Sequence, residues 1–214
     1  MPKRVDHDQR RRQITEALWR IAAERGIEAV SIREVATEAG MSIGLVQHFF
    51  ASKDEMLMFA TSHLREKLEG RIRRGLTALP EPATPLETLR ALLVALLPLD
   101  HDSREETLVG IAFFIRALND PVLATRYRQG RDQLTAAVAD QLRAIRRDAK
   151  TDLEPTTETR PEPTTETDLE LTAETLLALV EGLASDLLLG RHSPQQALRI
   201  LDHHLQTSTR GLTR

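Results

Sequence analysis

A series of helix-start signals constrains the fold of this chain more than any other feature. In a capping box, a Ser or Thr side chain and a Glu or Gln three residues later each accept a hydrogen bond from the other's backbone N–H. The chain offers five such pairs: Ser31–Glu34, Ser52–Glu55, Thr84–Glu87, Ser103–Glu106 and Ser193–Gln196. Pro85 and Pro194 stand at the first helical position after two of these caps, where a missing N–H does no harm. Signals of this kind predict a chain built from helices.

Hydrophobic periodicity between these signals places the helices. It predicts them at about 9–25, 32–39, 43–50, 53–78, 85–98, 104–119, 121–149, 169–190 and 194–208. No stretch alternates apolar and polar residues as a half-buried strand does. Aromatic residues make up only 3% of the chain, so its core must consist mainly of Leu, Ala, Ile and Val. We therefore expect an all-α fold of about nine helices, with a three-helix N-terminal domain and a C-terminal antiparallel helical bundle.

Several classes of function find little support. The chain has no cysteine, which excludes disulfides and thiolate chemistry, and its seven histidines show no metal-ligand spacing. We expect no metal, no cofactor and no enzymatic activity, with a small helical enzyme as the weaker alternative. The longest apolar run, 89–99, is shorter than the roughly 18 residues of a membrane span, and the start of the sequence has no secretory signal. These features predict a cytoplasmic protein without a membrane partner.

Charge is distributed unevenly along the chain. The net charge is −3, yet residues 1–53 hold nine Lys/Arg against seven Asp/Glu. Residues 150–170 hold two basic and seven acidic residues and repeat EPTTET. A proline-containing acidic stretch of this kind buries too little surface to order itself, so we expect a disordered loop at 150–168. A Thr-rich interaction or phosphorylation segment is the alternative.

The stretch SIREVATEAGMSIGLVQHFF, at 31–50, contains two short helices around one glycine. Ala36 is small enough for two helices to cross closely, and Gly40 suits a turn that requires positive φ. Val35, Ala39, Met41 and Val46 would close the seam between the helices. This spacing favours a helix-turn-helix, whose second helix enters the DNA major groove.

Residues 10–57 resemble the DNA-binding domain of the tetracycline-repressor family. The positions that match its pattern are Gly26, Ser31, Ile32, Arg33, Glu34, Val35, Ala36, Ala39, Gly40, Met41, Ser42, Gly44, Val46, Phe50, Ser52, Lys53 and Leu57. The tail from Leu177 to Leu205 resembles the branch that contains choline-responsive repressors. The chain departs from the pattern at Gln47, where the family often has tyrosine, and at Phe49, where it has histidine. The resemblance implies a DNA-binding domain at 1–53 and a ligand-binding, dimerising domain at 54–214.

The resemblance also implies a set of residues that contact DNA. These are Ser31, Arg33, Ser42, Ile43, Gly44, Leu45, Gln47, His48 and Lys53, joined by a basic N-terminal arm with Arg10, Arg11 and Arg12. Gln47 has the donor and acceptor needed to read adenine, and Ile43 can contact a thymine methyl group. Arg33 and Lys53 are expected on phosphates. Capping alone would explain Ser31 and Ser42, solvent exposure would explain Gln47 and His48, and a fraying terminus would explain the arm.

The C-terminal helices suggest two further surfaces. A broad apolar face predicts a dimer interface formed by Leu176, Leu177, Val180, Leu183, Ala184, Leu187, Leu188, Ala197, Leu198, Leu201 and Leu205, although an ordinary core would show the same pattern. A ligand pocket is expected around Phe113, Phe114, Arg116, Asn119, Tyr127 and Glu181, where scarce aromatic and polar groups occur beside apolar ones. For each of these residues, the alternative is an ordinary position in the core or on the surface without a role in ligand binding.

These expectations combine into one hypothesis. The chain is a sequence-specific transcriptional regulator, more a repressor than an activator, that binds a palindromic operator in double-stranded DNA as a homodimer. A small-molecule effector would release or modulate it. The alternative is a helical interaction or scaffold protein whose helix-turn-helix no longer reads DNA.

Overall fold

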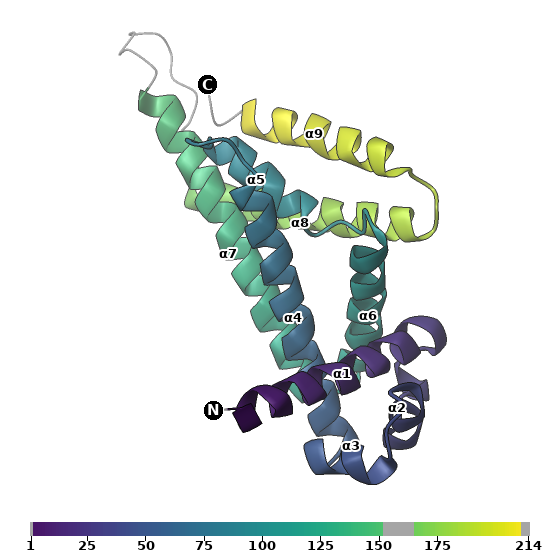
Figure 1. Ribbon diagram of the computed structural model, residues 1–214. Helices are drawn as coiled ribbons and strands as arrows, with labels where there is room; N and C mark the ends of the chain where they lie inside the picture. The colour runs from purple at the N-terminus through teal and green to yellow at the C-terminus, as the bar shows by residue number, and fades with distance from the viewer. Residues whose placement is uncertain (1, 152–164, 211–214) are drawn as a thin grey trace, which may run out of the picture. The chain divides into compact units, whose positions relative to one another are not determined.

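The computed structural model describes residues 2–151 and 165–210, with the side chains of 7–149 and 165–209. Most of the expected loop at 150–168 lies outside the described residues. The described part is entirely helical (Figure 1), and its elements are α1 (Pro2–Arg25), the 3₁₀ helix η1 (Ile27–Ala29), α2 (Ile32–Glu38), α3 (Ile43–Phe49), α4 (Lys53–Thr77), α5 (Pro85–Val94), α6 (His101–Ala117), α7 (Pro121–Thr151), α8 (Glu166–Leu188) and α9 (Pro194–Arg210). The predicted all-α class is confirmed.

Most helices begin where the capping signals predict. The hydroxyl of Ser31 accepts from the Glu34 N–H at 3.1 Å, and Thr84 and Glu87 form a complete capping box at the start of α5. The box predicted at Ser103 is wrong, because Asp100 caps α6 and Ser103 occupies its third helical position. The Asp100 carboxylate accepts from a free N–H group of the first helical turn, as a serine cap would. The helix therefore begins three residues earlier than predicted.

Besides α6, two other helices begin earlier than predicted. A box formed by Thr165 and Asp168 starts α8 at Glu166, so the last residues of the expected acidic loop form the first turn of a helix instead. The acidic side chains that suggested disorder also favour a helix N-terminus, where they complement the helix dipole. The backbone of α1 begins at Pro2 rather than near residue 9, which makes the expected arm helical.

The chain forms two compact units. Unit 1 contains the residues up to Glu69 together with Asp100–Tyr127, and unit 2 contains Gly70–Leu99 with the residues from Arg128 onward. The expected division at residue 53 does not coincide with these units, because α1 packs against α6 as well as against α2 and α3. The N-terminal helices therefore share one core with the start of α4 and with α6.

The core of unit 1 is built around one face of α1. Its members come from α1, η1, α2, α3, α4 and α6, and the largest fully buried side chains among them are Trp19, Phe50, Ile14, Leu18, Ile21, Met56 and Leu57. Each of them is at most 2% exposed. The short helices α2 and α3, which could not fold alone, gain their stability from this shared core.

The core of unit 2 is aliphatic. It joins α5, α7, α8 and α9 through Leu89, Leu93, Leu142, Leu169, Leu176, Leu201 and other aliphatic residues. Arg90 of α5 donates two hydrogen bonds to the Asp202 carboxylate of α9, at 2.6 and 3.0 Å. None of the described helices is long and apolar enough to cross a membrane. The described residues also contain no cluster of His, Cys, Asp or Glu that could hold a metal ion.

Candidate nucleic-acid interface

The pair α2–α3 is fixed by its own turn. Gly40 has φ of 64°, a left-handed conformation that favours glycine. The Met41 N–H donates to the Ala36 carbonyl at 2.9 Å, and the Ser42 hydroxyl accepts from the Leu45 N–H at 3.1 Å. Val46 is fully buried in the seam. The predicted roles of Ala36 and Gly40 agree with this geometry.

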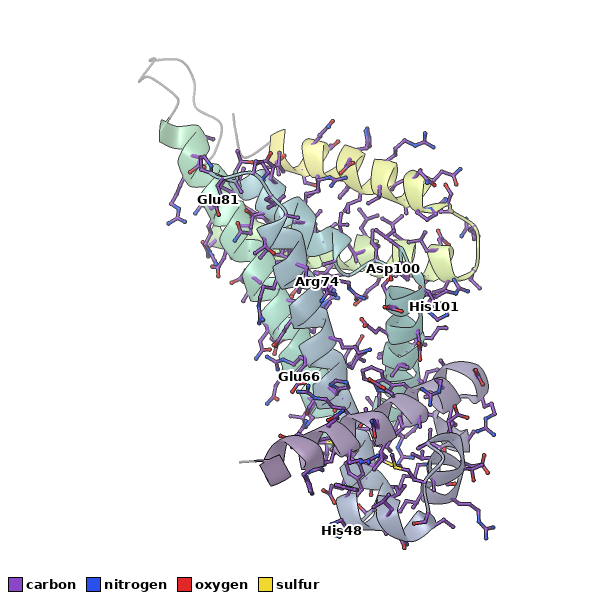
Figure 2. The ribbon with its side chains drawn as sticks, in the orientation of Figure 1. His48, Glu66, Arg74, Glu81, Asp100 and His101 are labelled. Atoms are coloured by element: carbon purple, nitrogen blue, oxygen red, sulfur yellow. The ribbon has the colours of Figure 1, made fainter. Side chains whose placement is uncertain are left out.

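One face of α3 remains exposed to solvent. The exposed residues are Ser42, Ile43, Gly44, Leu45, Gln47 and His48, which we call the recognition surface. Ile43 and Leu45 are 41% and 38% exposed, an unusual position for large aliphatic side chains that the core does not need. Figure 2 shows His48 at the edge of unit 1. A short helix with its inner face anchored and its outer face free has the geometry of a recognition helix.

Arg33 and Lys53 flank the recognition surface. Arg33 is exposed on α2, and Lys53 lies in the first turn of α4, directly after the cap formed by Ser52. Neither side chain forms an ion pair within the described part of the chain. A helix N-terminus next to a lysine attracts a phosphate group, and a guanidinium can bind one through two donors.

Ser31 and Ser42 both act as helix caps. Each hydroxyl accepts from a backbone N–H and still has a proton to donate. Capping explains both serines, so the structure adds no evidence for their expected contact with DNA.

The three arginines of the expected basic arm have different surroundings, because the Arg11 side chain contacts other residues of unit 1. Its guanidinium lies 4.5 Å from the ring centroids of both Phe50 and Phe59 and forms an ion pair with Glu55 at 2.9 Å. The Glu55 carboxylate also accepts from the Ala51 N–H. Arg11 thus connects α1 to the start of α4 and is not free to contact a phosphate.

Other arginines of α1 are paired as well. Arg20 donates to Glu38 at 2.7 Å and Arg25 to Glu34 at 2.9 Å, which connects α1 to α2. Arg12 lies 3.6 Å from Glu66 of α4, and Arg10 donates to Gln13. The pairs with Glu38 and Glu34 connect α2 to α1, and the ion pairs of Arg12, Arg20 and Arg25 reduce the positive charge available to DNA.

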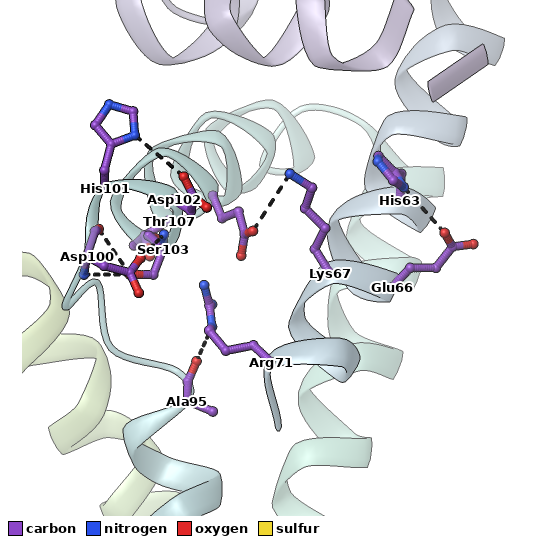
Figure 3. A network of polar contacts seen from close by, with 11 residues as sticks. His63, Glu66, Lys67, Arg71, Ala95, Asp100, His101, Asp102, Ser103 and Thr107 are labelled. Carbon is purple, nitrogen blue, oxygen red and sulfur yellow. Dashed lines mark hydrogen bonds and ion pairs between the residues drawn. The ribbon is translucent and has the colours of Figure 1, made fainter. Parts of the chain in front are cut away.

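Sequence reasoning missed a cluster between α1 and α4. The rings of Trp19 and His63 stack with centroids 5.0 Å apart, and Lys67 lies 4.9 Å above Trp19. Figure 3 shows His63 directed at Glu66, and Lys67 forms an ion pair with Glu106 of α6 at 4.0 Å. In the sequence, Trp19 shares one helix face with apolar residues. That pattern does not indicate polar partners on other helices.

The residues expected to line a ligand pocket lie in different surroundings. Phe113 is 6% exposed and belongs to the core of unit 1. Phe114 and Tyr127 are partly exposed, with ring centroids 5.2 Å apart. Glu181 lies in unit 2, where it pairs with Arg131.

Arg116 and Asn119 have different surroundings. Arg116 lies 3.8–3.9 Å from three carboxylates, those of Glu28, Asp54 and Asp120. Asn119 is exposed at the end of α6. Arg116 therefore connects α6 with η1 and with the start of α4, and its charge is already balanced there.

The residues expected at a dimer interface are largely internal. Nine of the eleven are buried in unit 2, and Leu188 and Leu198 are half-buried. They pack against α5 and α7 of the same chain. The apolar face that predicted a dimer interface is therefore explained by the core of one chain.

This fold, with an anchored turn and an exposed second helix flanked by cations, defines a helix-turn-helix DNA-binding protein. The profile of the family described as "Bacterial regulatory proteins, tetR family" matches residues 14–58, and that of "BetI-type transcriptional repressor, C-terminal" matches residues 85–210. The chain belongs to the TetR family. The family comprises transcriptional regulators and not enzymes, as predicted.

Individual relatives agree with this assignment. The HTH-type transcriptional regulator PksA of Bacillus subtilis is 39% identical over 113 residues, which cover 53% of this chain and 54% of PksA. The regulator BetI of Rhizobium meliloti is 31% identical over 117 residues, covering 55% of this chain and 56% of BetI. The chain thus spans about half the length of the curated relatives it matches.

Solved structures extend the similarity to nearly the whole chain. A transcriptional regulator from Rhodococcus sp. Rha1 has a TM-score of 0.77 at 32% identity and covers 95% of this chain and 98% of its own. A transcriptional regulator from Saccharomonospora viridis, solved in complex with choline, has a TM-score of 0.70 at 25% identity. It covers 94% of this chain and 95% of its own.

Proposed function

We propose that this protein represses transcription in the cytoplasm by binding a palindromic operator as a homodimer. The observation that carries the proposal is the recognition surface of α3, which is exposed while the opposite face of the helix is buried in the core. Gln47 offers a donor and an acceptor to base edges, and Ile43 and Leu45 offer apolar contact to thymine methyl groups. Arg33 and Lys53 supply phosphate contacts on the two sides.

The proposed dimer needs a surface other than the buried leucines. The outward face of α8 offers one, because it combines large exposed apolar residues with small ones: Leu171, Thr175, Ala178, Gly182 and Leu189. Leu171 and Leu189 are 56% and 78% exposed, and small residues between them allow a second helix to approach closely. A two-fold dimer carries two recognition helices, one for each half of a palindrome.

We further propose that a small molecule modulates DNA binding. The structure of the relative with choline supports this, as does the exposed aromatic pair Phe114–Tyr127, which offers ring faces to an apolar or cationic ligand. An effector changes DNA affinity only to the extent that it binds the DNA-competent and DNA-free conformations differently. Choline is a first probe, added to the protein in calorimetry and in the DNA-binding assay.

The proposal is tested by footprinting and gel shift on the DNA upstream of the chain's own gene. We expect protection of a two-fold symmetric site, and an affinity that falls steeply with salt because phosphate contacts release counterions. Equal affinity for that DNA and for a scrambled duplex would instead support the scaffold alternative.

A further inference from the structure

The C-terminal end of α3 carries a cluster of three aromatic rings that the resemblance does not predict. The Phe49 ring lies 4.8 Å from the His7 ring, at 57°, and 5.2 Å from the His48 ring, at 78°. His7 belongs to α1, whose N-terminal end lies beside the end of α3 in Figure 1. We call His7, His48 and Phe49 the histidine cluster. Phe49 stands where the family pattern has histidine, so one aromatic ring here holds two imidazoles from different helices.

The two imidazoles are exposed at a surface that is otherwise poor in positive charge. Both His7 and His48 are exposed, and residues 43–50 contain no lysine or arginine. Imidazole is the side-chain group that gains a proton, and with it one positive charge, most readily as pH falls below neutral. When protonated, an imidazole donates from both ring nitrogens, and phosphate oxygens accept such bonds.

The charged groups of the packed helices determine how this charge acts. On α1 they are Asp8, Arg10 and Arg11, on α2 they are Arg33, Glu34 and Glu38, and at the start of α4 they are Lys53, Asp54 and Glu55. Of the five carboxylates, Glu34, Glu38 and Glu55 are held by arginines of α1, and Asp54 lies 3.9 Å from Arg116. Asp8 is exposed on α1. A new positive charge on the histidine cluster is therefore largely uncompensated and remains available to DNA.

We propose that His7 and His48, held together through Phe49, form a proton-dependent contact with DNA phosphates. His48 lies on the recognition helix and touches the backbone directly. His7 adds a second charge from α1, and its packing on Phe49 keeps both rings at the DNA-facing end of α3. Because phosphates are the same in every sequence, the contact strengthens binding to all DNA as pH falls. This inference rests on the proposed DNA binding.

The experiment measures affinity for upstream DNA and for a scrambled duplex, at pH 7.5 and pH 5.5, over a range of salt. For the wild type we expect affinity to rise about five- to twentyfold on both duplexes at the lower pH. Each new phosphate contact should also steepen the slope of log affinity against log salt by about 0.9. Thermal unfolding at both pH values checks that every variant is folded.

Variants separate charge from packing. His7→Phe keeps a ring on Phe49 without an imidazole and should remove about half of the pH effect. His7→Arg should give the steeper salt slope already at pH 7.5. The double variant His7→Phe/His48→Gln should lose the pH effect, whereas His101→Gln, at an exposed histidine on α6, should retain it.

The outcomes distinguish this inference from the proposed function. Specific binding at pH 7.5 with no rise at pH 5.5, or a full rise in the double variant, would overturn the histidine contact and leave the regulator intact. Absence of specific binding at pH 7.5 would overturn the proposed function, and absence of binding to either duplex at both pH values would overturn both.

Discussion

At the scale of single residues, the structure divides the polar side chains around α3 into those that hold the helix and those that remain free. Arg11, Arg20 and Arg25 belong to the first group, since each pairs with a carboxylate of a neighbouring helix. The side chains of Gln47, Arg33 and Lys53 belong to the second, since they have no polar partner among the described residues. Sequence reasoning grouped Arg11 with the DNA contacts because three consecutive arginines look alike, and only the positions of Phe50, Phe59 and Glu55 distinguish the middle one.

Substitution of Gln47 tests base recognition. Gln47→Ala removes a donor and an acceptor from the recognition surface, and we expect the preference for the operator over single-base variants to fall by about 1–3 kcal/mol at one position of each half-site. Lys53→Ala is the matched comparison, since it should weaken all sequences alike and reduce the salt slope by about one. Competition gel shifts measure both. If the base preference of Gln47→Ala were unchanged, Gln47 would not be a residue that reads a base.

Substitution of Arg11 tests its structural role. Arg11→Ala removes the contacts with two aromatic rings and the ion pair with Glu55, and we expect the free energy of unfolding to fall by about 1–3 kcal/mol. Arg12→Ala is the control, because its side chain is 55% exposed and its loss should cost less than about 0.5 kcal/mol. Urea denaturation distinguishes them. If both variants lost the same small amount of unfolding free energy, Arg11 would not have this structural role and would again be a candidate for DNA contact.

At the scale of helices, most starts could be predicted because capping is local. Ser31, Ser42, Thr84 and Ser193 all lie at helix starts, and each fixes a boundary through hydrogen bonds within four residues. The box predicted at Ser103 is wrong because an aspartate, Asp100, caps that helix. The box at Thr165 was missed because its partner is Asp168 rather than Glu or Gln. Partners of a helix face are not local, which is why the buried leucines of α8 could not be assigned to a core rather than to a dimer.

The capping box of α5 predicts a pH dependence. The Thr84 backbone N–H, and then its hydroxyl, donate to the Glu87 carboxylate and lower the pKa of that carboxyl. Since the pKa is lowered in the folded state, the contribution to stability is present above the ordinary pKa of glutamate and is lost as pH falls through the lowered one. We expect Glu87→Ala to be less stable than the wild type at pH 7, with the difference closing in strong acid.

Denaturation in urea at several pH values measures that difference. Glu24→Ala, at an exposed position of α1, serves as the control for the loss of a surface carboxylate. A gap between Glu87→Ala and the wild type that did not depend on pH would show that the carboxylate does not stabilise the start of α5.

At the scale of the whole molecule, the proposed function depends on a dimer of two copies of the chain. Leu171→Glu places a charge on the outward face of α8, where a second copy would have to bury it, and we expect a dissociated protein. Sedimentation velocity measures this, and the monomer should bind the operator at least tenfold more weakly because only one half-site is engaged. Leu86→Glu, on α5, is the control and should remain dimeric. A Leu171→Glu variant that still sediments as a dimer would move the interface elsewhere.

The pairing of arginines on α1 with carboxylates also has a kinetic consequence. Among the described side chains of α1, most arginines are already paired with carboxylates, and the net charge of the chain is −3. Long-range attraction to the phosphate backbone is therefore weak, even though the close phosphate contacts made on the bound site depend on salt. The protein should hold random duplex weakly, slide over short distances and search the chromosome mostly by repeated three-dimensional encounters, so that its residence time comes from contacts made only after the correct bases meet α3.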